Sequence, residues 1–252
     1  MSEERNIHVC KNCGKHAPET YCQYCGEMTH YKRITFTDTL AQFLSASFSL
    51  EGRLLSTVAM MVRNPGRLFK DYISGKRRPY YKPVAFFMVL TAVYILIRLL
   101  LNYDPLEGQM LEVQAPEHAE VQNNAKRAAR FMVSNINYIM FFLVFAIGLA
   151  MKLFYWKRYN LAEYTTMGFY MSGIYVITGL LFMLSSAFFS FHANQIQLLL
   201  LFIIITYSTA SLIGKRSIGH LLKYGLVGMI AIFLYVLLGY SFSFVVVTLS
   251  NS

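Results

Sequence analysis

The residues with the clearest chemistry in this 252-residue chain are four cysteines, which form two short repeats near its start. Each repeat reads Cys-x-x-Cys-Gly, at residues 10–14 and 22–26. Zinc prefers four soft thiolate ligands in a tetrahedron, and each such turn offers two sulfurs while the glycine permits a tight backbone turn. The pattern therefore predicts a structural zinc site made of Cys10, Cys13, Cys22 and Cys25.

Two other states of these cysteines are chemically open. Disulfide pairing is disfavoured because the first 35 residues are polar and resemble no secretory signal, so the thiols are expected in a reducing compartment. Iron takes a similar four-sulfur geometry, as in rubredoxin, but nothing in the short loops favours it. A closed four-thiolate site leaves no position for a reactive water, so the metal is expected to stabilise the fold and not to hydrolyse a substrate.

The head that carries these cysteines is predicted to span residues 1–35 as a zinc ribbon. Only eight residues separate Cys13 from Cys22, too few for an apolar core, so the metal must do most of the folding. The head holds five Lys and Arg against four Asp and Glu, although the whole chain carries a formal charge of +10. Nucleic acid is therefore an unexpected partner, because the excess positive charge lies outside the head.

The remainder of the chain has the composition of a membrane protein. The sequence is 56% hydrophobic and only 14% charged, which is unusual for a soluble domain. The predicted fold class is an all-α helical membrane protein with about five transmembrane helices and a small N-terminal zinc-ribbon head. No acidic residue lies in these spans, since Asp71 and Glu163 are assigned to loops. Within a membrane domain at 83–252, the spans are expected at 83–102, 136–155, 167–190, 195–214 and 224–249, each long enough to cross about 30 Å of hydrocarbon.

Residues 36–82 are predicted to lie along the membrane surface. Apolar residues recur at helical spacing over 40–48 and 54–62, and the charges of Glu51 and Arg53 argue against a single span there. Pro65 and Gly66 then break the helical pattern. The segment that follows suits a cytoplasmic juxtamembrane position, where its cations either set the topology or bind anionic lipid headgroups. These cations are Arg63, Arg67, Lys70, Lys76, Arg77, Arg78 and Lys82.

The charges of the loops predict the orientation in the bilayer. Lys and Arg follow the second and fourth spans, whereas residues 191–194 and the C-terminal tail have none. With five spans, the positive-inside rule places the N-terminus in the cytosol and the C-terminus outside, in a multi-pass protein of the bacterial inner membrane. The loop at 103–135 is then external, and its stretch 117–133 is expected to form a short helix on the outer surface.

Two charges fall inside the predicted spans, Arg98 in the first and Lys152 in the second. A charge within a membrane is a functional hypothesis by default. Both residues lie near span ends, where long side chains reach the interface, so anchoring is favoured over a substrate or proton pathway.

The segment RNPGRLFKDYISGKRRPYYKPVAFF at residues 63–87, together with the cysteine head, resembles an uncharacterised family of bacterial membrane proteins. Members combine a four-cysteine zinc ribbon, an amphipathic region and a Pro-Gly and Gly-Lys-Arg motif before a multispan body. The resemblance implies this architecture and no activity. A looser likeness, to the five-span Yip family of trafficking proteins, rests on topology alone. The residues that correspond to the motif before the first span are Pro65, Gly66, Tyr72, Gly75, Lys76, Arg77, Tyr80 and Pro83.

The favoured function is that of a non-enzymatic scaffold or regulator whose cytosolic zinc ribbon docks a protein partner. Tyr21 and Tyr24 would be presented beside the two Cys-x-x-Cys turns, called the knuckles below. An enzyme is not expected, because no Gly-x-Ser-x-Gly, His-Glu-x-x-His or phosphate-cradling glycine loop occurs. The alternative is a small-molecule or ion transporter or channel. Its path would be lined by polar residues of the second and fourth spans: Asn137, Thr206, Ser208, Thr209 and Ser211. The sequence names no substrate, partner or oligomeric state.

Overall fold

The computed structural model describes residues 8–17, 20–28, 52–103, 120–189, 194–215 and 217–250. These residues form eight α-helices and two short strands. Five helices are long and apolar enough to cross a membrane, which confirms the predicted helical membrane fold. They are α4 (Pro83–Leu100), α6 (Ile136–Tyr155), α7 (Leu161–Phe189), α8 (Asn194–Ile213) and α9 (Ile218–Ser250).

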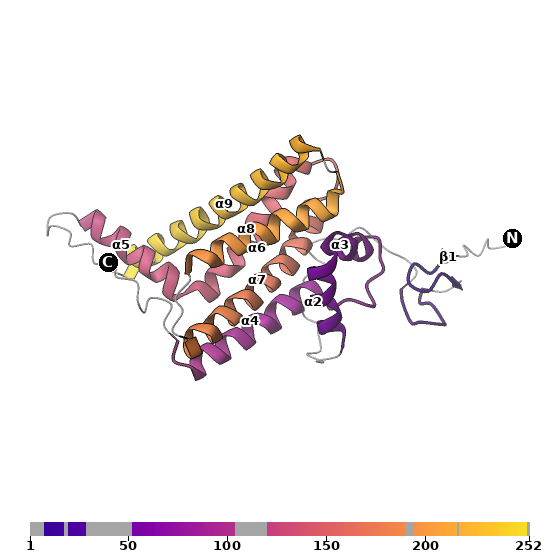
Figure 1. Cartoon of the computed structure of the whole chain (residues 1–252), viewed down its shortest axis with the longest axis horizontal. Coiled ribbons are helices and arrows are strands. Elements are labelled where there is room, and N and C mark those ends of the chain that lie inside the picture. The colour runs from indigo at the N-terminus through magenta and orange to yellow at the C-terminus, as the bar shows by residue number, and fades with distance from the viewer. Residues whose placement is uncertain are drawn as a thin grey trace.

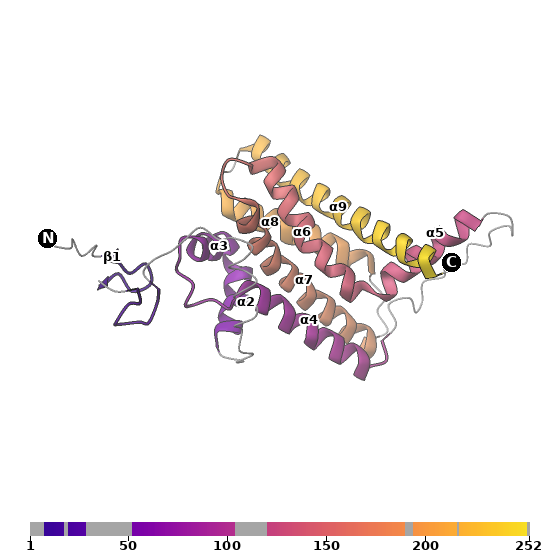
Figure 2. The same ribbon diagram turned by 180° about the vertical axis from the view of Figure 1, so that it is seen from behind.

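The five long helices pack into one bundle with α7 at its centre (Figures 1 and 2). Helix α7 contacts α4, α6 and α8, and α9 packs against α6 and α8. Within the candidate span of α7, 61% of the residues are buried, against 28% for α9. Exposed leucine, valine and phenylalanine side chains cover the outer face of α9, where contact with lipid would bury them.

Two shorter helices cover the end of the bundle where α4, α7 and α9 begin, called the head end below. These are α2 (Arg53–Arg63) and α3 (Pro65–Ile73). Asn64 separates them and caps α3, because its side-chain oxygen accepts a hydrogen bond from the Arg67 amide at 3.0 Å while Pro65 occupies the first helical position. The expected break at Pro65 and Gly66 is thus a joint between two helices. The other predicted amphipathic stretch, at 40–48, lies outside the described residues.

The cysteine head, residues 8–28, lies beyond α2 and α3 at the same end (Figures 1 and 2). Strand β1 (His8–Val9) pairs antiparallel with β2 (His16–Ala17), and an isolated bridge joins Tyr21 to Met28. Each pairing closes one Cys-x-x-Cys loop, so the head is two small hairpins side by side.

Helix α5 (Glu120–Ser134) lies at the opposite end of the bundle, against α9 near the C-terminus (Figure 1). Its position along the chain matches the short helix expected at 117–133. Residues 104–119, which make up most of the rest of that loop, are outside the described part of the chain.

Helix α7 begins earlier than the predicted span. The start at Leu161 places Glu163 in its first turn, where the residue is buried, so the expectation of a loop position for Glu163 is wrong. Asn160 and Glu163 form a capping box: the Asn160 amide donates to the Glu163 carboxylate at 2.6 Å, and the Glu163 amide donates to the Asn160 side chain at 2.8 Å. Asp71 was also expected in a loop and lies in α3 instead.

Candidate functional site

The four cysteine sulfurs converge on one point of the head. All four lie within 4.8 Å of one another, and the Cys10–Cys25 and Cys13–Cys22 sulfur pairs are each 3.6 Å apart. A tetrahedron with zinc–sulfur bonds of about 2.3 Å has edges of about 3.8 Å, which agrees with these separations. The four cysteines therefore fit a metal ion, and they would hold it with a complete set of protein ligands.

The two knuckles reach this geometry through the same backbone turn. The Gly14 amide donates to the Cys10 carbonyl at 2.8 Å, and the Gly26 amide donates to the Cys22 carbonyl at 2.7 Å. Both glycines have positive φ angles, 74° and 66°, which residues with a Cβ rarely adopt. The glycine after each cysteine pair is therefore required by the turn that aims the sulfurs inward.

The pKa values of two of the thiols, Cys13 and Cys25, are shifted in opposite directions. Burial would raise the pKa of Cys25, but hydrogen bonds from the Glu27 backbone and the Asn12 side chain, with the neighbouring thiols, lower it to about 6. A hydrogen bond from the Lys15 backbone lowers the pKa of Cys13, whereas burial and the three other thiols raise it to about 11. Thiolates repel one another, so a bound cation would supply the charge that lets all four ionise.

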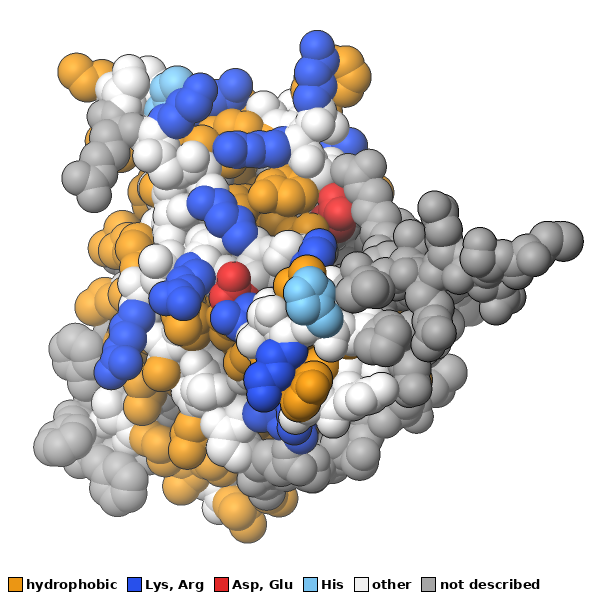
Figure 3. Space-filling view, turned by 90° about the vertical axis from the view of Figure 1, so that its right-hand side faces the viewer, with side chains coloured by type: hydrophobic (Ala, Val, Ile, Leu, Met, Phe, Trp, Pro, Cys, Tyr) orange, Lys and Arg blue, Asp and Glu red, His pale blue; other side chains and the backbone are white. Residues whose placement is uncertain are grey.

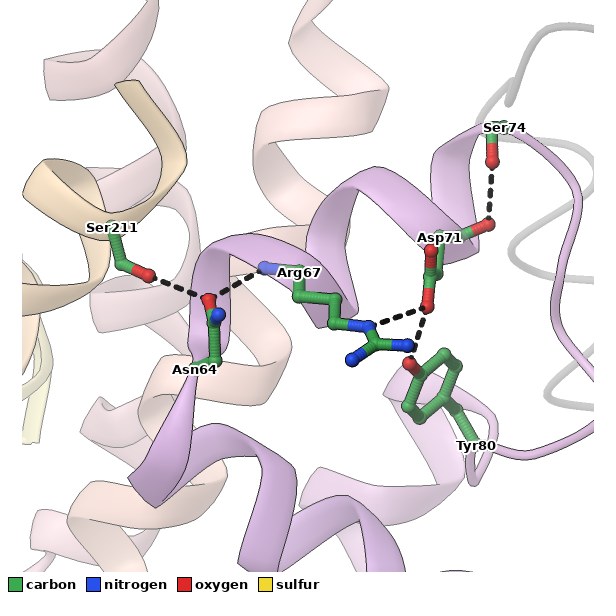
Figure 4. Close-up of polar contacts among 6 residues, drawn as sticks. All are labelled: Asn64, Arg67, Asp71, Ser74, Tyr80 and Ser211. Carbon is green, nitrogen blue, oxygen red and sulfur yellow. Dashed lines mark hydrogen bonds and ion pairs between the residues drawn. The ribbon is translucent and has the colours of Figure 1, made fainter. Parts of the chain in front are cut away.

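A polar joint fastens α3 to the end of α8 (Figure 4). The Asn64 side-chain oxygen accepts hydrogen bonds from the Ser211 hydroxyl and the Arg67 amide, both at 3.0 Å. The Ser211 hydroxyl also accepts one from the Gly66 amide at 3.0 Å. On α2, the Val62 and Arg63 carbonyls accept from the Tyr207 hydroxyl at 3.1 and 2.9 Å. These bonds hold the basic segment against the bundle.

The loop between α3 and α4, residues 74–82, is called the basic loop below, and hydrogen bonds also hold it in place. The Tyr80 hydroxyl donates to the Asp71 carboxylate at 2.7 Å, and the Arg67 guanidinium lies 3.8 Å from the same oxygen (Figure 4). Burial and the bond to Asp71 raise the pKa of Tyr80, which keeps its phenol protonated as a donor. The loop also meets α7, because the Tyr170 hydroxyl donates to the Tyr81 carbonyl at 2.6 Å.

A cavity of about 400 Å³ lies between the second Cys-x-x-Cys turn of the head and the basic loop. Within it, the Arg77 Nε donates to the Tyr72 carbonyl at 3.2 Å, and the guanidinium carbon lies 5.3 Å from the Tyr72 ring centre. Figure 3 views the head end of the molecule, where Lys and Arg side chains are spread widely and few acidic side chains appear. The cavity is lined by Cys25, Gly26, Glu27, Arg53, Tyr72, Arg77, Arg78, Tyr80 and Lys82.

Only some of the basic residues that the sequence analysis selected line this cavity. Arg77, Arg78 and Lys82 line the cavity, whereas Arg63, Arg67, Lys70 and Lys76 are not among its lining residues. Sequence reasoning missed Arg53 and Glu27, which join the cavity from α2 and from the head. Neither carries a local signal, because their proximity to the basic loop arises only from folding.

The charges predicted inside the spans lie at helix ends. Arg98, in the last turn of α4, donates from its Nε to the Tyr103 carbonyl at 3.3 Å. The Lys152 ammonium donates to the Trp156 and Tyr159 carbonyls at 2.6 and 3.1 Å. Each side chain therefore binds the backbone where its helix stops, a placement that suits an anchor.

Two of the hydroxyl groups of α8 are engaged by protein atoms. Thr209 donates to the Ile205 carbonyl of its own helix at 2.8 Å, and Ser211 belongs to the joint with α3. Ser208 is buried, and Thr206 is a partly buried residue whose hydroxyl has no hydrogen-bond partner among the described residues. The side chain of Asn137 lies outside the described part of the structure.

The chain thus combines a four-cysteine head with a Pro-Gly joint before a bundle of five long helices. Residues 51–95 match the family DUF3667, proteins of unknown function. The DUF3667 segment comprises α2, α3, the basic loop and the first part of α4, and it contains six of the nine residues that line the cavity. The resemblance to an uncharacterised family is thereby confirmed over this stretch. No curated protein and no solved structure matches the chain.

Proposed function

We propose that the protein is a non-enzymatic membrane scaffold or regulator whose head, held by one zinc ion, docks a cytosolic protein partner. The observation that carries this proposal is the exposure of two aromatic side chains on a very small head. Tyr21 is 57% exposed and Tyr24 is 64% exposed, and both belong to the second hairpin. Exposed tyrosines on a rigid support are typical of residues that dominate protein interfaces.

The surroundings of Tyr24 indicate the chemistry of the partner. The Lys15 ammonium lies 4.2 Å from the centre of the Tyr24 ring, so a cation flanks the aromatic surface. Met28 and Val9 add exposed apolar area to the head. A partner that fits would offer an apolar pocket with a carboxylate at its rim.

The transporter alternative has less support. The predicted polar path would need hydroxyl groups that face a substrate, yet Thr209 donates to the backbone of its own helix and Ser211 bonds Asn64. Arg98 likewise binds a backbone carbonyl at the end of α4. The membrane helices are therefore assigned the role of holding the head and the basic segment at the bilayer.

The test is a crosslinking comparison in native membranes between the intact protein and Tyr21→Ser/Tyr24→Ser. This double variant leaves all four cysteines in place, so the metal content should be unchanged and serves as a check that the head is folded. Tyr138→Ser is the matched control, because Tyr138 is 69% exposed but lies at the start of α6, away from the head. A partner that is captured by the control and lost from the double variant would support docking. Identical partners for all three proteins would refute it.

A further inference from the structure

The cavity between the cysteine head and the basic loop has an unbalanced charge. Of the nine described residues that line it, four are cations, namely Arg53, Arg77, Arg78 and Lys82, and one is an acid, Glu27. Gathering like charges in a partly enclosed space is unfavourable unless an anion balances them. Its volume of about 400 Å³ accommodates a phosphate group together with part of the molecule that bears it.

Arg77 is the best-defined binding group in this cavity. Its Nε bond to the Tyr72 carbonyl and its approach to the Tyr72 ring fix the plane of the guanidinium. The Nη2 nitrogen of the same side chain is buried, and no described residue accepts a hydrogen bond from it. Buried guanidinium donors are normally satisfied, so this nitrogen calls for an acceptor that the described residues do not provide.

Asp71, the acidic residue of α3, does not supply this acceptor. Asp71 is bound by the Tyr80 hydroxyl at 2.7 Å and pairs with Arg67, which is outside the cavity lining. The phenol that contacts Asp71 also holds the loop in place. The Asp71 carboxylate is therefore engaged outside the cavity, and the buried Arg77 Nη2 is left without an acceptor among the described residues.

The position of the cavity along the bundle agrees with a phosphate ligand. Lys82 directly precedes Pro83, the first residue of the candidate span α4, and Arg53 begins α2. Residues at the start of a transmembrane helix lie at the depth of lipid headgroups, within reach of both lipid phosphates and soluble phosphate compounds.

We propose that this cavity is a phosphate-binding site in which Arg53 and Arg77 bind the phosphate oxygens. The Glu27 carboxylate of the head competes with the phosphate for the same positive groups. The Glu27 carboxylate accepts a hydrogen bond from the Arg78 backbone and faces the positive charges of Arg77 and Arg53. An arriving phosphate displaces this carboxylate, since it offers more oxygen acceptors and more charge to the same groups. The proposal is independent of the docking surface, because Tyr21 and Tyr24 do not line the cavity.

The experiment uses the full-length protein in nanodiscs and has two arms that separate the sources of phosphate. In the first, native mass spectrometry counts the phosphatidylglycerol and phosphatidylcholine that remain bound after release from mixed nanodiscs. In the second, calorimetry measures pyrophosphate binding in nanodiscs of neutral phosphatidylcholine only. The variants are Arg53→Gln and Arg77→Gln, with Arg158→Gln as the control, because Arg158 is exposed at the same end and outside the cavity lining.

The expected result is at least about a tenfold loss of affinity for Arg53→Gln and Arg77→Gln in one arm, with Arg158→Gln unchanged. Loss in the first arm identifies a lipid headgroup, and loss in the second identifies a soluble phosphate compound. Glu27→Gln should strengthen binding several-fold, a gain that misfolding cannot produce. If neither arm separates the Arg53 and Arg77 variants from the Arg158 control, and Glu27→Gln does not increase affinity, the proposal is overturned.

Discussion

The amide of Gly66 donates a hydrogen bond to the side-chain hydroxyl of Ser211 at 3.0 Å, although 145 residues separate the two. Their contact brings α3 onto the end of α8 so closely that a Cβ added to Gly66 would lie 2.2 Å from the Ser211 carbonyl carbon. Such an approach is possible only for glycine. The Pro-Gly joint of the DUF3667 segment is therefore one of the places where the basic segment is fixed to the helical bundle.

Gly66→Ala should separate α3 from α8. The added methyl group meets backbone atoms, which cannot rotate aside, so we expect a loss of stability at or above the range of about 1–3 kcal/mol that overpacking costs. Thermal unfolding in detergent, followed by the fluorescence of Trp156, would measure it. Gly219→Ala is the control, because a Cβ there meets nothing within 4 Å and alanine favours the helix. Equal melting temperatures for the two variants would contradict the contact.

Tyr170→Phe should weaken the attachment of the basic loop to α7. The change keeps the buried ring, which packs against Phe69, Tyr72 and Phe86, and removes the hydroxyl that donates to the Tyr81 carbonyl. An unpaired buried carbonyl costs about 1–3 kcal/mol, so the melting temperature should fall. Tyr138→Phe supplies the comparison, since Tyr138 is largely exposed. An unchanged melting temperature for Tyr170→Phe would show that water or another donor replaces the hydroxyl.

Because the four thiolates converge on one point, we expect about one zinc ion per chain in protein purified without a chelator. Cys22→Ser/Cys25→Ser removes two of the four sulfurs and should lose the ion, whereas His16→Ala should retain it because four thiolates already complete the tetrahedron. Elemental analysis by mass spectrometry gives both the identity and the number of metal ions. Iron in place of zinc would keep the site but change its assignment, and metal retention by the double cysteine variant would disprove it.

The orientation in the membrane can be tested with reporters placed at the two ends of the bundle. Alkaline phosphatase fused after residue 252 should be active, because the predicted cytosolic N-terminus and five spans together place the C-terminus outside. The same reporter inserted at residue 215, in the loop after α8, should be inactive and green fluorescent protein there should be bright. The reverse pattern would place the cysteine head outside and would remove the basis for a cytosolic partner.

The chain itself carried enough information to predict the helical membrane class and the cysteine cluster. Both depend on local properties: a run of apolar residues long enough to cross hydrocarbon, and cysteine pairs whose glycines allow a tight turn. The placement of Arg98 and Lys152 near helix ends was predictable for the same reason. The start of α7 was not, because it depends on the mutual capping of Asn160 and Glu163.

The tertiary structure decided which of the basic residues act together. Arg77 and Arg78 face a cavity that Arg53 and Glu27 complete from other elements, while Arg67 is occupied by Asp71. The joint of Gly66 with Ser211 is likewise a contact between distant segments. Local sequence determines composition, spacing and helical periodicity, but a binding site depends on which side chains become neighbours, and packing of the whole bundle sets that.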